Sequence, residues 1–238
     1  MTQLQSARKE LRECATETDA QILQRFFKTG PGEYGEGDRF IGVRVPAIRR
    51  VAKTFRDLTL DETIRLLHSD IHEERLLALI ILTEKYRKGT DDEQKMVYEL
   101  YLSNTRYINN WDLVDLSAEH IAGAYLRDRS REPLYSLAQS TMLWERRISV
   151  LSTFHLIKRG EFGETLRIAE MLLRDKEDLI HKAVGWMLRE VGKRDRGVEE
   201  AFLKKHYRVM PRTMLRYAIE KFPEDLRQQY LKGTIDPP

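Results

Sequence analysis

The segment from Asn109 to Asp115 has the residue types and the spacing that chemistry requires. Asn110 suits a helix N-cap, and Asp112 would lie in the first turn, where the positive end of the helix dipole favours an acid. Trp111 and Asp115 are four residues apart and would share one helix face. A carboxylate beside an indole on a face that should be apolar indicates a reaction site, because a fixed carboxylate can position water and stabilise developing positive charge.

The rest of the chain predicts helices that would position this segment. Apolar residues recur with a helical period and almost never alternate, so we expect a nearly all-helical chain. Five of the 13 glycines fall between Gly30 and Gly42, which predicts one long acidic loop without the ending of a phosphate-binding loop. The predicted helices cover residues 3–14, 18–28, 46–56, 60–68, 72–87, 92–103, 110–127, 131–140, 144–158, 163–174, 178–193, 197–206, 211–221 and 224–231.

Five of these helices align as a repeat when the charged residue that opens each apolar stretch is taken as an anchor. The anchors follow one another after 37, 35, 35 and 30 residues, and they are Arg75, Asp112, Arg147, Lys182 and Arg212. Such a period, with one shorter helix between anchors, is typical of stacked helix pairs. We therefore expect an all-α, single-domain α-solenoid over residues 1–238, with a repeat core from about 46 to 225, a right-handed stack and a basic concave face.

Asp115 is the one charged residue at its position in the repeat. The other four members of the column three residues after the anchor are apolar or small, namely Ala78, Val150, Gly185 and Leu215. Because an unpaired buried carboxylate costs several kcal/mol, Asp115 either has a partner or lies where the array is open to solvent or ligand. Two interpretations stay open: a reaction site, or a buried salt bridge with an arginine such as Arg147.

The anchors and the tryptophans suggest a surface for nucleic acid. Most anchors are cations, which predicts a row of positive charge spaced closely enough to follow a phosphate backbone. All three tryptophans, Trp111, Trp144 and Trp186, lie on anchor helices, and aromatic side chains between cations are common on nucleic-acid-binding surfaces. The alternative is that the indoles fill the core between helices and the cations only border it.

Composition and single residues bear on the kind of partner, the cellular compartment and a possible metal site. The chain has 41 Lys and Arg against 38 Asp and Glu, and a charge of +3 does not by itself indicate a polyanionic partner. One cysteine, no predicted signal peptide and no membrane-length apolar run lead us to expect a cytoplasmic protein without internal disulfides. His68 and His72 have a zinc-ligand spacing but no third ligand in register, so we expect no metal.

Several stretches resemble the motifs of the AlkD-type DNA alkylation repair glycosylases. They are Trp111–Asp115, Trp144–Arg147, Lys182–Glu190, and the loop Ile41–Pro46 with the following Arg49 and Arg50. The resemblance extends from about residue 20 to residue 225. It implies a solenoid of HEAT-like repeats that grips duplex DNA in its concave face and excises purines alkylated at N3 or N7, without a cofactor.

The resemblance also implies roles for individual residues. Asp115 matches the catalytic carboxylate, Trp111 and Trp186 match the indoles that flank the deoxyribose of the lesion, and Arg147 matches an arginine near the lesion phosphate. Arg44 stands where a family member carries glutamine. The residues that we expect to contact DNA are Arg44, Trp144, Arg146, Lys182, Arg189 and Arg212.

One carboxylate is enough for this chemistry. An N3- or N7-alkylated purine is already a cation and leaves without a proton donor, whereas ordinary glycosidic bonds are typically cleaved by two carboxylates. We expect an ionised Asp115 to stabilise the oxocarbenium-like sugar and to position water, in a monomeric, monofunctional enzyme. The rival interpretations are a non-catalytic solenoid that binds protein or nucleic acid, and an RNA-binding solenoid, since fold alone does not fix function.

Overall fold

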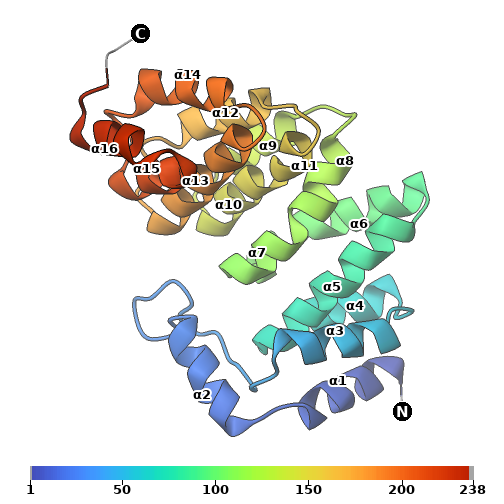
Figure 1. The fold of residues 1–238 in the computed structure, drawn as a ribbon. Coiled ribbons are helices and arrows are strands. Elements are labelled where there is room, and N and C mark those ends of the chain that lie inside the picture. The colour runs from blue at the N-terminus through green and yellow to red at the C-terminus, as the bar shows by residue number, and fades with distance from the viewer. Residues whose placement is uncertain (1, 236–238) are drawn as a thin grey trace. The chain divides into compact units, whose positions relative to one another are not determined.

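The computed structural model describes residues 2–235, which form helices joined by turns and one long loop (Figure 1). These residues contain no β-strand, and an isolated bridge joins Arg39 to Ile71. The prediction of an all-α fold is therefore confirmed. The chain divides into two compact units, of which the first runs to Ile121 and the second starts at Ala122, and the single domain stays a prediction.

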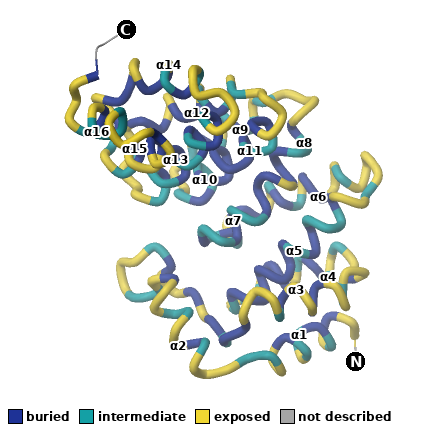
Figure 2. Tube along the Cα trace, in the orientation of Figure 1, coloured by how far each residue is buried: buried dark blue, intermediate teal, exposed yellow. Residues whose placement is uncertain are grey.

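The first unit is built around one buried helix. Its helices are α1 (Gln3–Glu13), α2 (Glu17–Phe26), α3 (Val45–Thr54), α4 (Leu60–Leu67), α5 (His72–Lys88), α6 (Asp91–Ser103), the 3-10 helix η1 (Thr105–Tyr107) and α7 (Trp111–Ser117). Thr2, Thr59 and Thr90 start α1, α4 and α6 with capping boxes. Helix α5 packs against α3, α4, α6 and α7 and is buried along most of its length (Figure 2).

The second unit is likewise built around a central helix, α13. Its helices are α8 (Ala124–Leu126), α9 (Glu132–Ala138), α10 (Leu143–Ser152), α11 (Phe154–Ile157), α12 (Gly163–Met171), α13 (Asp178–Gly192), α14 (Arg196–His206), α15 (Arg212–Ala218), the 3-10 helix η3 (Ile219–Lys221) and α16 (Glu224–Lys232). Helix α13 packs against α10, α12, α14 and α15. A Cβ atom at Gly185 would lie 2.4 Å from the backbone oxygen of Met214, so α13 and α15 approach this closely because residue 185 is glycine.

Most predicted helices agree with the observed ones to within a few residues, with two informative differences. The helix predicted over 110–127 consists of α7, a π-helical segment η2 (Glu119–Gly123) and α8. The helix predicted over 144–158 is divided into α10 and α11 at Thr153. The hydroxyls of Ser152 and Thr153 donate to the backbone oxygens of Ile148 and Val150, and such bonds compete with the regular helical pattern.

The predicted stacking of the repeat helices is confirmed, but the predicted row of exposed cations is wrong at two positions. Helices expected to be equivalent pack side by side within a unit, α5 against α7, α10 against α13, and α13 against α15, which confirms stacked helices. The predicted surface row of cations is wrong at Arg75 and Arg147, which are 4% and 5% exposed. Because a buried guanidinium needs internal partners, Arg75 pairs with Asp38, and Arg147 donates to the backbone oxygen of Leu179.

The helices of residues 2–235 include none with the length and apolar character that a membrane span requires.

Glu199 on α14 is a buried acid whose surroundings disfavour its charge. It is 2% exposed, and its Oε1 atom has no hydrogen-bond partner among the described residues. Burial raises the pKa of Glu199 to about 8, although the nearby Arg196 acts in the opposite direction. Glu199 therefore keeps its proton in the folded protein at pH values where the unfolded chain has lost it.

We expect the free energy of unfolding to fall as the pH rises from about 4.5 to about 8, because only the folded state holds the Glu199 proton in this range. Glu199→Gln should be more stable than the wild type at about pH 8 and should show a flatter pH dependence. Urea unfolding followed by tryptophan fluorescence measures both. Glu132→Gln on α9, an exposed position, is the control, and identical slopes for the wild type and Glu199→Gln would contradict the assignment.

Candidate functional site

Helix α7 begins where the sequence predicts. Asn110 is the N-cap, and its side-chain oxygen accepts a hydrogen bond from the backbone N–H of Trp111 at 2.8 Å. The Asn110 amide is fully buried and donates to Asp38 Oδ2 at 2.9 Å. Asp112 lies in the first turn, as expected. The cap therefore fixes the start of the helix and ties it to the glycine-rich loop that contains Asp38.

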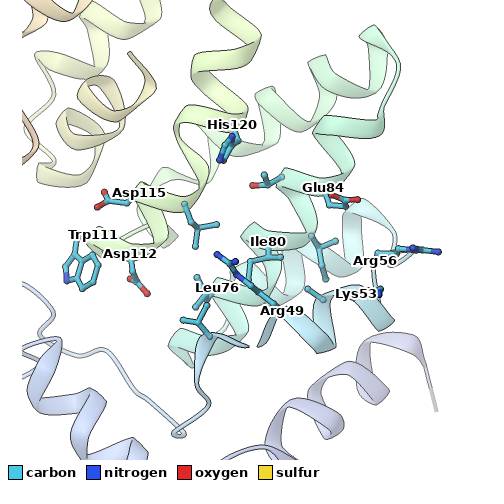
Figure 3. Close-up of a pocket in the computed structure, with 15 residues that line it drawn as sticks. Arg49, Lys53, Arg56, Leu76, Ile80, Glu84, Trp111, Asp112, Asp115 and His120 are labelled. Atoms are coloured by element: carbon cyan, nitrogen blue, oxygen red, sulfur yellow. The ribbon is translucent and has the colours of Figure 1, made fainter. Parts of the chain in front are cut away.

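A cavity of about 760 Å³ lies between α3, α5 and α7, and we call it the α7 cavity. Its polar residues include Arg49, Lys53, Trp111, Asp112 and Asp115, and its apolar wall comes mainly from α3, α5 and α7. Trp111, Asp112 and Asp115 lie together at one end, Lys53 lies toward the other, and Arg49 reaches into the space between (Figure 3). Trp111 and Asp115 are half-buried and line the same cavity, as their spacing predicts.

Aromatic side chains from the N-terminal region hold Trp111 in place. Phe27 stacks on the indole with ring centroids 5.1 Å apart, and Phe26 meets it edge-on at 5.9 Å. The indole Nε1 donates to the hydroxyl of Tyr34 at 3.3 Å. Helix α2 and the glycine-rich loop, to which the sequence analysis assigned no role, thus position the indole.

Polar and charged side chains connect α5, the glycine-rich loop and the start of α7. They are Asp38, His72, Arg75, Asn110 and Asp112, and we call them the His72 network. His72 opens α5 and is 1% exposed; its Nε2 lies 2.8 Å from Asp112 Oδ2 and its Nδ1 lies 3.0 Å from Asp38 Oδ2. Arg75 pairs with the other oxygen of Asp38. Burial alone would lower the pKa of His72, but Asp112 and Asp38 raise it to about 9. At neutral pH the network therefore matches two cations with two anions.

His68 and His72, which have the sequence spacing of zinc ligands, contact different groups in the structure. Both ring nitrogens of His72 are engaged by carboxylates. His68 instead stacks on Tyr107 at 4.1 Å, and its Nε2 lies 2.6 Å from Asn104 Oδ1. The two rings thus take part in separate clusters.

Glu73 holds the loop before α3 against α5. Its carboxylate is buried and accepts hydrogen bonds from the backbone N–H groups of Ile41, Gly42 and Val43 at 2.8 to 3.1 Å. Gly42 has φ of +87°, and a Cβ atom there would lie 2.0 Å from the backbone oxygen of Thr16. Glycine is therefore required at the point where the loop turns onto the carboxylate.

The second unit contains the other two tryptophans, in different environments. Trp186 on α13 is half-buried, with its ring 6.0 Å from that of Phe154. Trp144 on α10 is buried, with 8% of its surface exposed. The burial of Trp144 fits the alternative interpretation, in which the indole fills the core of its unit, and its contact with DNA stays a prediction.

Three predicted arginines of the second unit are largely buried against protein groups. Arg146 pairs with Asp175 at 2.7 Å, and Arg189 pairs with Glu220. Their side chains are 14% and 16% exposed, and Arg147 is more deeply buried than either. Each of the three contacts a group of its own unit, and their contacts with a ligand stay predictions.

The remaining predicted cations are more accessible. Lys182 is half-exposed and lies 2.7 Å from Asp178, and Arg212 is exposed on α15. Arg44 is exposed at the start of α3, where its guanidinium holds the pKa of Asp19 below its usual range. Exposed ion pairs of this kind add little to stability, so a ligand anion can replace the acid at small cost.

The sequence analysis missed two features of the α7 cavity. Arg49 and Lys53 of α3 and Arg56 of the following turn are exposed and line the cavity, and the spacing of Arg49 and Lys53 puts them on one face of α3. That spacing was visible in the sequence. Asp112 was treated as an exception among the anchors, whereas the structure gives it a buried cation as its partner. No local signal connects Asp112 to a histidine 40 residues earlier.

Comparisons with known proteins agree with this architecture. A family model described as DNA alkylation repair enzyme matches residues 7–222. A search of curated proteins found no match. Among solved structures, one described as a predicted DNA alkylation repair enzyme from Enterococcus faecalis is similar, with a TM-score of 0.68 and 14% sequence identity over 88% of this chain and 97% of that chain. At this identity the likeness shows a shared fold.

We expect Glu73→Gln to lower the free energy of unfolding by about 2–3 kcal/mol, because bonds to a charged buried acceptor are lost and an amide NH₂ would face backbone N–H groups. Urea unfolding measures the change. Glu99→Gln, on the exposed face of α6, is the matched control and should differ from the wild type by less than about 0.5 kcal/mol. Equal stability of the two variants would show that the Glu73 contacts contribute nothing.

Proposed function

The chain belongs to the DNA alkylation repair enzyme family, and we propose that it is a DNA glycosylase for cationic N3- or N7-alkylated purines in duplex DNA. The observation that carries this proposal is the position of Asp115, half-buried at one end of the α7 cavity beside an indole and near exposed cations of α3. In a merely structural helix this column of the repeat would hold an apolar residue, as it does at Ala78 and Val150.

The proposed reaction needs little from the protein beyond charge and position. The alkylated purine leaves with the electron pair of its bond to the sugar carbon C1′ and becomes neutral, so it takes up no proton. The sugar becomes oxocarbenium-like, and the Asp115 carboxylate stabilises this cation. Asp115 then accepts a proton from the water that attacks C1′, which leaves an abasic site. The Trp111 indole offers its π-face to the cationic sugar.

The second unit would contribute the other contacts. We keep Trp186 as a second indole at the sugar and Arg147 as the arginine near the lesion phosphate. The proposed DNA contacts are Arg44, Trp144, Arg146, Lys182, Arg189 and Arg212, to which we add Arg49 and Lys53 of α3 and Arg56 of the turn after it. The reaction as written requires no cofactor, and we propose that the protein acts as a cytoplasmic monomer.

Asp115→Asn should lower the rate of 7-methylguanine release from methylated duplex DNA by about 100-fold or more, because it removes the charge but keeps the shape. The affinity for DNA should stay nearly unchanged. Single-turnover base release and fluorescence anisotropy measure the two quantities. Asp61→Asn, on the exposed face of α4, is the control. Normal excision by Asp115→Asn would end the catalytic assignment, and wild-type DNA binding without excision would favour a non-catalytic scaffold.

The cations of α3 should act on affinity rather than on chemistry. Lys53→Ala is expected to weaken binding of duplex DNA of any sequence and to reduce the salt dependence of log Kd by about one unit, because one phosphate contact is lost. Titrations at several salt concentrations measure this slope. Lys95→Ala, also exposed but on α6, should leave it unchanged. An unaltered slope in Lys53→Ala would remove α3 from the interface.

A further inference from the structure

Helix α7 carries two carboxylates that line the same cavity, and they have different surroundings. Asp112 and Asp115 are three residues apart on the helix. Two neighbouring carboxylates disfavour each other's ionisation unless a cation compensates one of them. For Asp112 that cation is His72, whose Nε2 donates to Oδ2 at 2.8 Å. The second oxygen, Oδ1, is buried without a hydrogen-bond partner among the described residues.

The His72 ring is fixed from several sides. Its Nδ1 donates to Asp38, and its ring stacks on Phe40 at 4.3 Å. It also lies 5.1 Å from the ring of Phe27, which in turn stacks on Trp111. One imidazole therefore contacts the acid of the first turn of α7 directly and the indole of the same turn through a single intervening ring.

We propose that His72 is a positioning residue for excision: as an imidazolium it holds the Asp112 carboxylate, and with it the first turn of α7, so that Trp111 and Asp115 keep their places at the cavity. This inference rests on the proposed function. Without the cation, the largely buried Asp112 carboxylate would lose its charged partner and turn into the cavity toward Arg49. This change alters the end of the cavity where Asp115 lies.

The charged groups around His72 define how this role depends on pH. They are Asp112 from α7, Asp38 from the loop, and Arg75 from α5 itself. His72 loses its proton as the pH rises through about 9, and the cation between the two carboxylates is then gone. The stabilisation that the ion pairs give to α7 is complete below about 6.5 and is lost between that pH and about 9.

His72→Gln tests the proposal because it keeps an N–H donor but removes the charge. At neutral pH we expect kcat for 7-methylguanine release to fall about tenfold or more, with KM changed less than about twofold. The wild type should lose activity with a midpoint near pH 9, and His72→Gln should lack this alkaline limb. His68→Gln is the matched control, since His68 is exposed and outside the network, and should keep the wild-type kcat and limb.

Two further measurements, on a double variant and on Asp112→Asn, distinguish the loss of the His72 charge from a general failure of the variant to fold. His72→Gln/Asp112→Asn removes both charges and should recover kcat about threefold or more over the single variant. Asp112→Asn alone should shift the His72 titration, followed by NMR of its imidazole, and the alkaline limb to lower pH. This NMR readout needs no excision, and it applies even where His72→Gln does not fold.

The outcomes distinguish the two proposals. If the wild type releases no alkylated base, the proposed function fails and the role of His72 fails with it. If the wild type excises normally but His72→Gln keeps its kcat and alkaline limb, or if Asp112→Asn leaves the His72 titration unshifted, only the positioning role is overturned. A drop in kcat that the double variant relieves supports the role.

Discussion

The first turn of α5 buries four ionisable side chains in succession, His72–Arg75, and the architecture of the first unit depends on how their charges are matched. Buried charges are costly unless they are paired and hydrogen-bonded. The partners come from the N-terminal region. Arg8 of α1 lies 2.9 Å from Glu74, and backbone N–H groups of the loop before α3 donate to Glu73. Asp38 of the same loop binds His72. Groups of α1 and of the loop before α3 thus meet the buried charges at the start of α5.

Paired charges also position the residues of the candidate site. Asp38 and Asp112 bind opposite sides of one imidazole, and Asn110 joins Asp38 to the start of α7. Apolar packing can tolerate small shifts, whereas hydrogen bonds between charged groups impose distance and direction. The turn that carries Trp111 and Asp115 is thus oriented by polar contacts from three segments, while in the second unit the close approach of α13 and α15 depends on the absence of a side chain at Gly185.

The sequence predicted the parts of this structure that have local signals. The helical period gave most helix boundaries, Asn110 marked the start of α7, and the repeat alignment singled out Asp115. The His72 network could not be predicted, because the pairs that contact each other in it lie 34 to 72 residues apart in the sequence. A first turn of His-Glu-Glu-Arg also has the composition of a solvated helix end. The repeat identified Arg75 and Arg147 as equivalent but could not show that this position is buried.

The two α7 carboxylates line the same cavity but have different neighbours. Asp112 has the buried His72 as its partner. Asp115 lies near Tyr101, whose pKa is raised by burial and further by the charge of Asp115. A carboxylate near a buried phenol and an apolar wall acts on a nearby cation more strongly than it would in water, because the local dielectric is low. Asp115 lines the α7 cavity together with Trp111, and these are the surroundings that the proposed stabilisation of a sugar cation requires.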